Sequence, residues 1–261
     1  MGEGKYRSVI QDMTWSYSRV KAFESCPYRW FLKYILEEET EPTFFASFGS
    51  FLHKLIDRYY REGRRPEQLV TDYLAGFRRE VEGSAPNSKI YSNWFQSGLR
   101  YLRSIQPLPF NPLETELKAE FLSDGRIPMV GFIDYVGTDG DDLVIVDHKS
   151  RDLKPRSNRK KPTKQDEELD EYLRQLYLYA EAVWHKYGKY PKWLCFNCFR
   201  TGVLIREPFR EEAYEEAKRW LRERIWTIED EEDFRPNMDW FQCSYLCECR
   251  NECEYFEMNR R

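Results

Sequence analysis

The chain has 261 residues, of which 41% are hydrophobic and 33% are charged, and its formal net charge is -4. A chain of this length can bury one sizeable core, so we expect a single domain over residues 1–261. The charge total gives no support for polyanion binding, which must come from local patches. No apolar run approaches the roughly 20 residues of a membrane span, and the N-terminus lacks the apolar core of a secretory signal. These features predict a soluble, cytoplasmic protein without a membrane partner.

The N-terminal part of the chain has helical patterns. Hydroxyl side chains suited to a helix cap open the segment 16–25, and Pro27 marks a break before a second, aromatic helix. Residues 44–60 place apolar side chains at helical spacing, with His53 among them. A lone histidine in such a stripe is more often a core residue than a ligand.

From about Leu113 the apolar residues alternate with a period of two, which is typical of strands. Short Asp-Gly turns separate the first three of these segments as in hairpins. The expected elements are strands at 116–121, 128–136 and 142–149, a helix at 169–184, strands at 193–199 and 203–207, and a helix at 211–226. This order predicts an α/β or α+β fold.

Acidic residues lie at the ends of two of these strands. Asp147 and Lys149 project from the same face of an extended chain, and hairpin pairing would bring Asp134 beside Asp147. Two neighbouring carboxylates repel each other without a cation, so the pair suggests a Mg²⁺ or Mn²⁺ site. Such a metal could activate a water molecule, with Lys149 assisting at a phosphodiester. A single D-x-K triplet is nevertheless a weak motif, which ordinary strand-end residues also explain.

Four segments together resemble one family. Gly131-Phe-Ile-Asp134 matches a G-x-x-D element and Asp147-His148-Lys149 a D/E-x-K element. Gly49-Ser-Phe-Leu-His53 has the form G-x-x-x-H, and Gln175-Leu-Tyr-Leu-Tyr179 the form Q-x-x-x-Y. These motifs resemble those of the PD-(D/E)XK nuclease superfamily, in its RecB-like branch.

The resemblance implies a restriction-endonuclease-like core, with a mixed central sheet flanked by helices and a catalytic core at residues 113–210. It implies Mg²⁺ or Mn²⁺ as cofactor, bound by His53, Asp134, Asp147 and the main-chain carbonyl of His148. The implied catalytic residues are Asp134, Asp147, Lys149, Gln175 and Tyr179. Relatives often carry a further acidic residue in the preceding strand, for which Glu116 competes with Glu114 and Glu120.

Four cysteines, Cys243, Cys247, Cys249 and Cys253, lie within eleven residues near the C-terminus. Their spacing alone allows a zinc site or disulfides. The distant Cys26 resembles the N-terminal cysteine of iron–sulfur members of the family. That resemblance implies a 4Fe-4S cluster on Cys26, Cys243, Cys247 and Cys253, in a lobe built from residues 14–36 and 236–261. Because Cys243 and Cys247 are separated by three residues instead of two, Cys249 remains an alternative to Cys247.

Two further cysteines, Cys195 and Cys198, form a C-x-x-C pair inside an expected strand. Residues three apart in a strand face opposite sides, so we expect two buried thiols and no joint metal site.

Basic residues gather directly after Lys149. The segment 149–164 contains eight lysines or arginines and one acidic residue, which suits contact with phosphates, although a solvated loop explains it equally well without a neighbouring site. The residues expected to bind nucleic acid are Arg156, Arg159, Lys160 and Lys161.

The leading hypothesis is a metal-dependent DNA nuclease, an exonuclease on single strands or DNA ends. The resemblance extends to roles in recombination, repair, phage DNA metabolism or CRISPR adaptation, with a helicase or CRISPR adaptation protein as partner. The alternatives are a non-catalytic DNA-binding scaffold that keeps the fold and a zinc-dependent structural protein.

Overall fold

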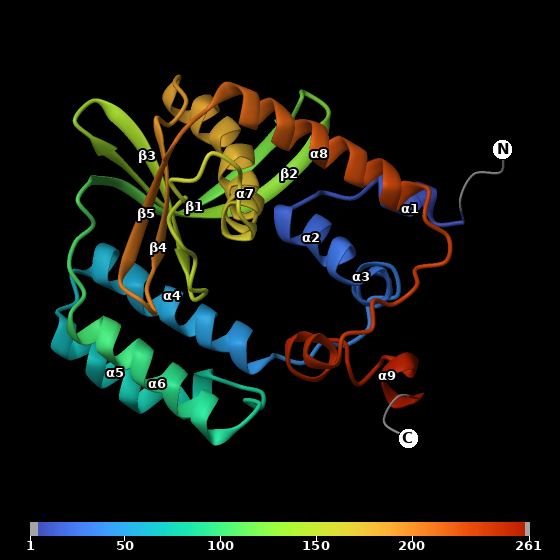
Figure 1. Cartoon of the computed structure of the whole chain (residues 1–261), viewed down its shortest axis with the longest axis horizontal. Helices are drawn as coiled ribbons and strands as arrows, with labels where there is room; N and C mark the ends of the chain where they lie inside the picture. The colour runs from blue at the N-terminus through green and yellow to red at the C-terminus, as the bar shows by residue number, and fades with distance from the viewer. Residues whose placement is uncertain (1–4, 259–261) are drawn as a thin grey trace.

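The structure is a computed structural model that describes residues 5–258, with the side chains of residues 5–256 (Figure 1). Its N-terminal half is helical and its centre is a sheet. The elements in chain order are α1 (Arg7–Gln11), α2 (Tyr17–Ser25), α3 (Pro27–Tyr34), α4 (Phe44–Glu62), α5 (Pro66–Glu80), α6 (Ser88–Arg103), β1 (Asn111–Ser123), β2 (Ile127–Asp139), β3 (Asp142–Lys149), α7 (Lys164–Tyr187), β4 (Trp193–Cys198), β5 (Val203–Pro208), α8 (Glu211–Glu229), η1 (Gln242–Leu246) and α9 (Glu254–Met258).

The five strands form one mixed sheet in the order β1-β2-β3-β4-β5. Three neighbouring pairs are antiparallel, whereas β3 and β4 are parallel because the crossover through α7 separates them. The mixed, helix-flanked sheet expected from the sequence is therefore confirmed. One detail was wrong: Asp134 does not close its strand, because β2 continues to Asp139 and pairs there with β3.

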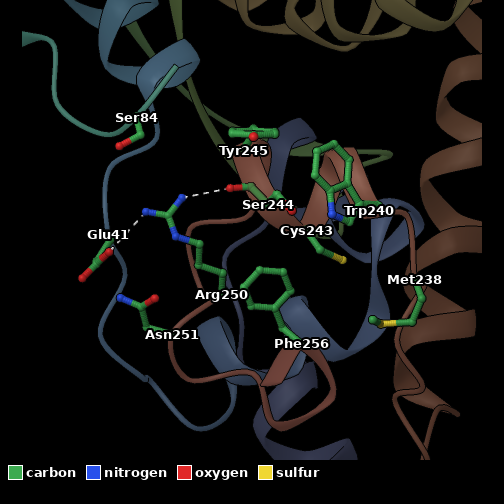
Figure 2. Close-up of a pocket in the computed structure, with 10 residues that line it drawn as sticks. All are labelled: Glu41, Ser84, Met238, Trp240, Cys243, Ser244, Tyr245, Arg250, Asn251 and Phe256. Carbon is green, nitrogen blue, oxygen red and sulfur yellow. Dashed lines mark hydrogen bonds and ion pairs between the residues drawn. The ribbon is translucent and has the colours of Figure 1, made fainter. Parts of the chain in front are cut away.

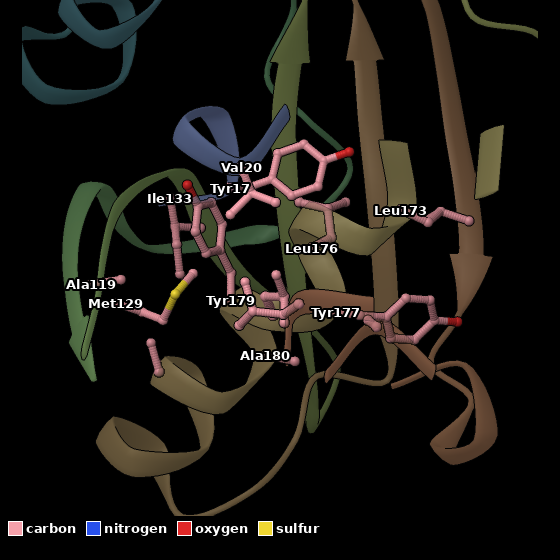
Figure 3. Packing of buried hydrophobic residues seen from close by; sticks show 14 of the residues in the cluster. Tyr17, Val20, Ala119, Met129, Ile133, Leu173, Leu176, Tyr177, Tyr179 and Ala180 are labelled. Carbon is pink, nitrogen blue, oxygen red and sulfur yellow. The ribbon is translucent and has the colours of Figure 1, made fainter. Parts of the chain in front are cut away.

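Helix α7 covers one face of the sheet. Thr163 caps its first turn by accepting a hydrogen bond from Asp166 N, and Gly188 ends it in the left-handed conformation at φ 73°. Its buried side chains, including Leu176 and Tyr179, lie against sheet residues such as Ile133 (Figure 3). Helix α8 packs on α7 and extends the same layer.

The helices α4, α5 and α6 pack together beside the other part of the sheet (Figure 1). Of these three helices, the sequence patterns predicted only α4. Leu69, Tyr73 and Phe77 of α5 are buried and spaced four residues apart, so a helical signal was present there. Helices α5 and α6 together hold α4, which carries His53, against the sheet.

The two ends of the chain meet in one lobe, where α2 and α3 lie beside the C-terminal segment (Figure 1). Lys33 Nζ donates to Glu248 Oε1 at 2.9 Å, and Tyr28 donates to Glu254 Oε1 at 3.1 Å. Leu32 is buried among the cysteines of this segment. Within the described residues, none of the helices is long and apolar enough to cross a membrane.

Gly131 in β2 is the position where α7 comes closest to the strand. A Cβ atom at Gly131 would lie 2.6 Å from Cε1 of Tyr179, well inside contact distance. We therefore expect Gly131→Ala to lower the free energy of unfolding by about 1–3 kcal/mol through overpacking. Gly49→Ala is the matched control, since its Cβ would meet nothing closer than Ser150 Oγ at 3.7 Å. Equal chemical denaturation midpoints for the two variants would contradict this account.

Candidate active site

The site begins where β2 and β3 pair. Tyr135 lies opposite Val146, so the next position along both strands brings Asp134 opposite Asp147. His148 donates its main-chain N–H to Asp134 Oδ2 at 2.6 Å, which fixes the carboxylate between the strands. The two aspartate side chains are only 10% and 8% exposed. Hairpin pairing thus brings these carboxylates together, as the sequence suggested.

Three side chains from three elements converge on this point. Ligand atoms of His53 in α4, Glu116 in β1 and Asp134 in β2 all lie within 4.8 Å of one another, an arrangement that could hold a metal ion. His53 Nδ1 is 3.5 Å from Asp134 Oδ2. Glu116 adopts φ 50°, a left-handed backbone that is costly for a residue with a side chain and is typical of functional positions.

The choice among the three glutamates of β1 follows from this geometry. Glu114 pairs with Lys186 and accepts a hydrogen bond from Tyr187 at 3.3 Å, while Glu120 pairs with Lys118 on the exposed side of the strand. Only Glu116 of the three reaches the metal-binding group. The strand pattern alone could not distinguish them, because all three lie an even number of residues apart.

Lys149 connects Asp147 to α7. Its Nζ donates to Asp147 Oδ1 at 3.1 Å and to Gln175 Oε1 at 3.0 Å, and it lies 2.9 Å from Asp147 Oδ2. Gln175 Nε2 in turn donates to the hydroxyl of Tyr179 at 3.4 Å. The structure therefore joins four of the predicted catalytic residues in one chain of contacts, with Tyr179 acting through Gln175.

Burial and charge set the protonation of these groups. Burial raises the pKa of the Asp147 carboxyl to about 6, although the Lys149 ammonium opposes the shift. Burial also acts to raise the pKa of Asp134, but the His53 imidazole and the His148 N–H outweigh it and hold that pKa at about 2. Desolvation works against protonation of His53, yet the Asp134 carboxylate prevails and raises the pKa of His53. Burial and nearby Asp134 raise the pKa of Glu116. The cluster carries more negative charge than its own cations neutralise.

The donor set fits a hard divalent cation. Carboxylate oxygens and one imidazole suit Mg²⁺ or Mn²⁺ better than a soft metal. Asp147 Oδ2 is buried and makes no hydrogen bond among the described residues, although Lys149 Nζ lies 2.9 Å away, so this oxygen keeps acceptor capacity for a ligand. The cavity in front of this cluster has a volume of about 570 Å³. It is lined by Phe45, Ala46, Gly49, Ser50, His53, Lys54, Asp57, Glu116 and Ser150.

Lys54 and Asp57 were not singled out from the sequence. Asp57 accepts a hydrogen bond from Thr115 at 3.0 Å and so ties α4 to β1 beside Glu116. Asp57 lies one turn after His53 in α4, which is the signal that could have placed it at the site, whereas Lys54 directly follows His53 and has no such spacing.

The His148 ring points away from Asp147 and Lys149. Its Nδ1 lies 3.0 Å from Asn197 Nδ2, and its ring stacks on Tyr60 with centroids 6.4 Å apart. Burial lowers the pKa of His148 to about 4, so the ring is neutral. Its imidazole belongs to the packing between the sheet and α4, and a ligand role for its carbonyl stays a prediction.

The thiols of the terminal lobe face a common cavity. A cavity of about 20 Å³ is lined by Cys26, Cys243, Cys247 and Cys253, together with Arg29, Leu32, Pro236, Met238, Arg250 and Phe256. Cys249 is fully buried elsewhere, and its Sγ lies 3.8 Å from the carbonyl oxygen of Arg29. None of the seven cysteines forms a disulfide with another described residue.

A larger cavity of about 890 Å³ adjoins the thiols (Figure 2). Cys243 and Trp240 lie on its wall, and Arg250 reaches across it toward Glu41 at 3.5 Å and the carbonyl of Ser244 at 3.1 Å. Among the described residues that line this cavity, the one arginine is already paired with a carboxylate, and none of them belongs to the acidic cluster.

The other cysteine pair is buried as expected. Cys195 packs with Val144 and Val146 on one side of the sheet, whereas Cys198 belongs to the core on the other side. Burial raises the pKa of Cys195 to about 12 and that of Cys198 to about 11, so both are inert thiols.

The basic segment after Lys149 divides into two parts. Arg156 pairs with Asp170 and Glu207 at 2.6 and 2.9 Å, so its charge is used within the fold. The side chains of Arg159, Lys160 and Lys161 are exposed, and within the described residues no ion pair involves them. Nucleic-acid contact by these three residues stays a prediction, and Arg156 is less available for it because of its ion pairs.

With this geometry in place, comparison with known proteins identifies the class. The family model of the PD-(D/E)XK nuclease superfamily matches residues 14–254, and the chain belongs to that superfamily. A solved structure from Eubacterium rectale described as a "putative exonuclease" is similar in fold, with a TM-score of 0.52 and 14% identity, over 98% of this chain and 92% of that one. No curated protein matched the sequence.

Metal binding at this cluster should depend on pH. Protons compete with a divalent cation for His53 and Asp147, whose pKa values are both raised in the metal-free protein. We expect the affinity for Mn²⁺, measured by calorimetric titration, to fall about tenfold or more between pH 8 and pH 6. Asp147→Asn should weaken binding at pH 8 and reduce the pH dependence.

Glu120→Gln is the control for that titration, because it removes a carboxylate from the same sheet without touching the cluster. It should bind Mn²⁺ as the unmodified protein does. An affinity that is the same at pH 6 and pH 8 would show that these groups are not ligands.

Proposed function

We propose that this protein is a Mg²⁺- or Mn²⁺-dependent deoxyribonuclease of the RecB-like type, acting as an exonuclease on single-stranded DNA or DNA ends. One observation carries the proposal: a metal-binding group of His53, Glu116 and Asp134 lies beside Asp147, which is paired with Lys149. A lysine next to a metal site is what phosphodiester hydrolysis needs, because charge builds on the phosphate as water attacks.

Each residue has a role that follows from its contacts. His53, Glu116, Asp134 and Asp147 would hold the ion, which supplies Lewis acidity and lowers the pKa of bound water. Lys149 stabilises negative charge at the reacting phosphate and orients the attacking water through Nζ. Gln175 holds that ammonium in place at 3.0 Å, and Tyr179 positions Gln175. The buried surroundings strengthen these interactions because they exclude water.

The exposed cluster of Arg159, Lys160 and Lys161 supports a polyanionic substrate. We propose that it contacts the DNA backbone on the way to the site. We also propose a role in recombination, repair, phage DNA metabolism or CRISPR adaptation, with a helicase or CRISPR adaptation protein as partner; the motifs shared with RecB-like nucleases support this.

We further propose that Cys26, Cys243, Cys247 and Cys253 bind a 4Fe-4S cluster. A zinc ion with Zn–S bonds of about 2.3 Å would bring its sulfurs to about 3.8 Å from one another. In the described part of the chain, no three cysteine sulfurs lie within 4.8 Å of each other, although four thiols line one cavity. A multinuclear cluster separates its ligands more widely, so this spacing favours it over zinc.

Cleavage of end-labelled DNA tests the proposed reaction. With Mg²⁺ or Mn²⁺, the protein should shorten single-stranded DNA from its ends, and chelation should stop the reaction. Lys149→Met should lower kcat by about 10²-fold or more while the protein still unfolds cooperatively, because charge at the phosphate loses its partner. Lys118→Met, on the exposed side of β1, is the control. Undiminished cleavage by Lys149→Met would refute the assigned site, and binding without cleavage would favour the scaffold alternative.

The cysteine variants separate the two ligand assignments. Cys26→Ser should lose iron and the visible chromophore of anaerobically purified protein, because it removes a ligand more than 200 residues away in sequence from the others. Cys249→Ser should keep both, since its sulfur faces the Arg29 carbonyl. Iron and sulfide analysis measures the outcome. Full iron content in Cys26→Ser combined with loss in Cys249→Ser would mean that the C-terminal cysteines form a local site.

A further inference from the structure

Arg200 lies in the tight turn between β4 and β5 and carries a charge without a partner. No ion pair within 4.0 Å involves its guanidinium in the described part of the chain. Its Nε is buried and has no hydrogen-bond partner. Burial lowers the pKa of Arg200, against the weaker attraction of Asp152. Arg200 is half-buried, and its buried Nε is costly to keep unless something else pairs with it.

The guanidinium is nevertheless held firmly. It stacks on the ring of Trp94 with its centre 4.0 Å from the ring centroid. Its Nη1 donates to the main-chain oxygen of Ser150 at 3.3 Å. The guanidinium is thus held over the ring and at one of its nitrogens, while its remaining N–H groups have no hydrogen-bond partner among the described residues.

Its position connects it to the active site. Ser150 directly follows Lys149 and lines the same cavity as His53 and Glu116. Trp94 packs edge-on against Phe45, with ring centroids 4.7 Å apart, and Phe45 also lines that cavity. Arg200 is therefore anchored to the rim of the cavity from two sides.

Arg206, in the same β4–β5 hairpin, is an arginine with a structural role. Arg206 stacks on Trp193 at 3.9 Å, much as Arg200 stacks on Trp94, but it also pairs with Asp139 at 2.5 Å. The stack on Trp193 and the ion pair with Asp139 account for both the position and the charge of Arg206. Arg200 has its stack and one hydrogen bond to a main-chain carbonyl, but no carboxylate among the described residues pairs with its charge.

We propose that Arg200 forms a phosphate-binding site for the substrate strand, gripping a phosphodiester next to the scissile one. The proposal rests on the nuclease function above. A planar guanidinium with parallel N–H groups binds phosphate oxygens in a bidentate manner, and an anion at the cavity rim would pair with this half-buried charge. Arg200 is a binding residue that sets the position of the strand and takes no part in bond cleavage.

Steady-state cleavage of a single-stranded oligonucleotide tests the site. Arg200→Ala should raise KM about tenfold to a hundredfold with a smaller change in kcat, as expected for a lost charged hydrogen bond. Arg200→Lys should recover only part of the loss, because it keeps the charge without the fork. Arg206→Ala, which loses the equivalent stack, should keep the KM of the unmodified protein.

A scan with a methylphosphonate, which removes the charge of one phosphate at a time, gives a readout that altered folding cannot imitate. In the unmodified protein, one linkage near the cleavage point should show a raised KM when neutral, and Arg200→Ala should show no further loss at that linkage. If thermal unfolding shows that Arg200→Ala is poorly folded, the same scan is carried out with Arg200→Lys. A penalty at that linkage equal to the one in the unmodified protein would then contradict the site.

Two results would overturn the proposal in distinguishable ways. If the unmodified protein cleaves DNA but Arg200→Ala has the KM of Arg206→Ala, or shows the same penalty at every linkage as the unmodified protein, Arg200 binds no phosphate. If the unmodified protein cleaves no DNA with Mg²⁺ or Mn²⁺, the nuclease function fails and this inference fails with it.

Discussion

The register between β2 and β3 is the constraint on which the site depends, because it brings Asp134 and Asp147 together out of water. Two buried carboxylates on neighbouring positions of paired strands repel each other more strongly than they would in water. The fold offsets this repulsion with the imidazole of His53 and the ammonium of Lys149. Glu116 adds a third acidic group to the same point. The resulting excess of negative charge is the physical reason to expect a divalent cation.

The helices on both faces of the sheet hold the residues of the site in position. Helix α7 brings Gln175 to Lys149, and its close approach requires that β2 carry no side chain at Gly131. Helix α4 carries His53 and is held in place by α5 and α6. Alternation along β3 sends Asp147 and Lys149 toward the reacting centre and the His148 ring into the opposite packing layer. Gly131, His53 and Gln175, which lie in three distant sequence motifs, therefore contribute to the same site.

Local patterns in the sequence predicted much of this fold, and contacts between distant segments explain what they missed. The two-residue alternation and the Asp-Gly turns gave β1 to β3 and, through them, the pairing of Asp134 with Asp147. The choice of Glu116 over its neighbours needed the left-handed turn of its backbone, which no spacing reveals. Spacing left Cys249 as an alternative to Cys247, and the fold distinguishes them, because Cys247 lines the cavity shared with Cys26 whereas Cys249 Sγ lies 3.8 Å from the Arg29 carbonyl oxygen. In the sequence, Arg156 cannot be distinguished from its basic neighbours, because its ion pairs with Asp170 and Glu207 are formed only in the fold.

The acidic cluster of Glu116, Asp134, Asp147 and His53 should bind a divalent metal ion beside Lys149. The most direct measurement is anomalous diffraction from crystals of the protein grown with Mn²⁺. The account predicts an anomalous peak within coordination distance of Glu116, Asp134, Asp147 and His53, and no such peak in crystals of Asp134→Ala. A peak located elsewhere, or its persistence at the same position in Asp134→Ala, would contradict the account.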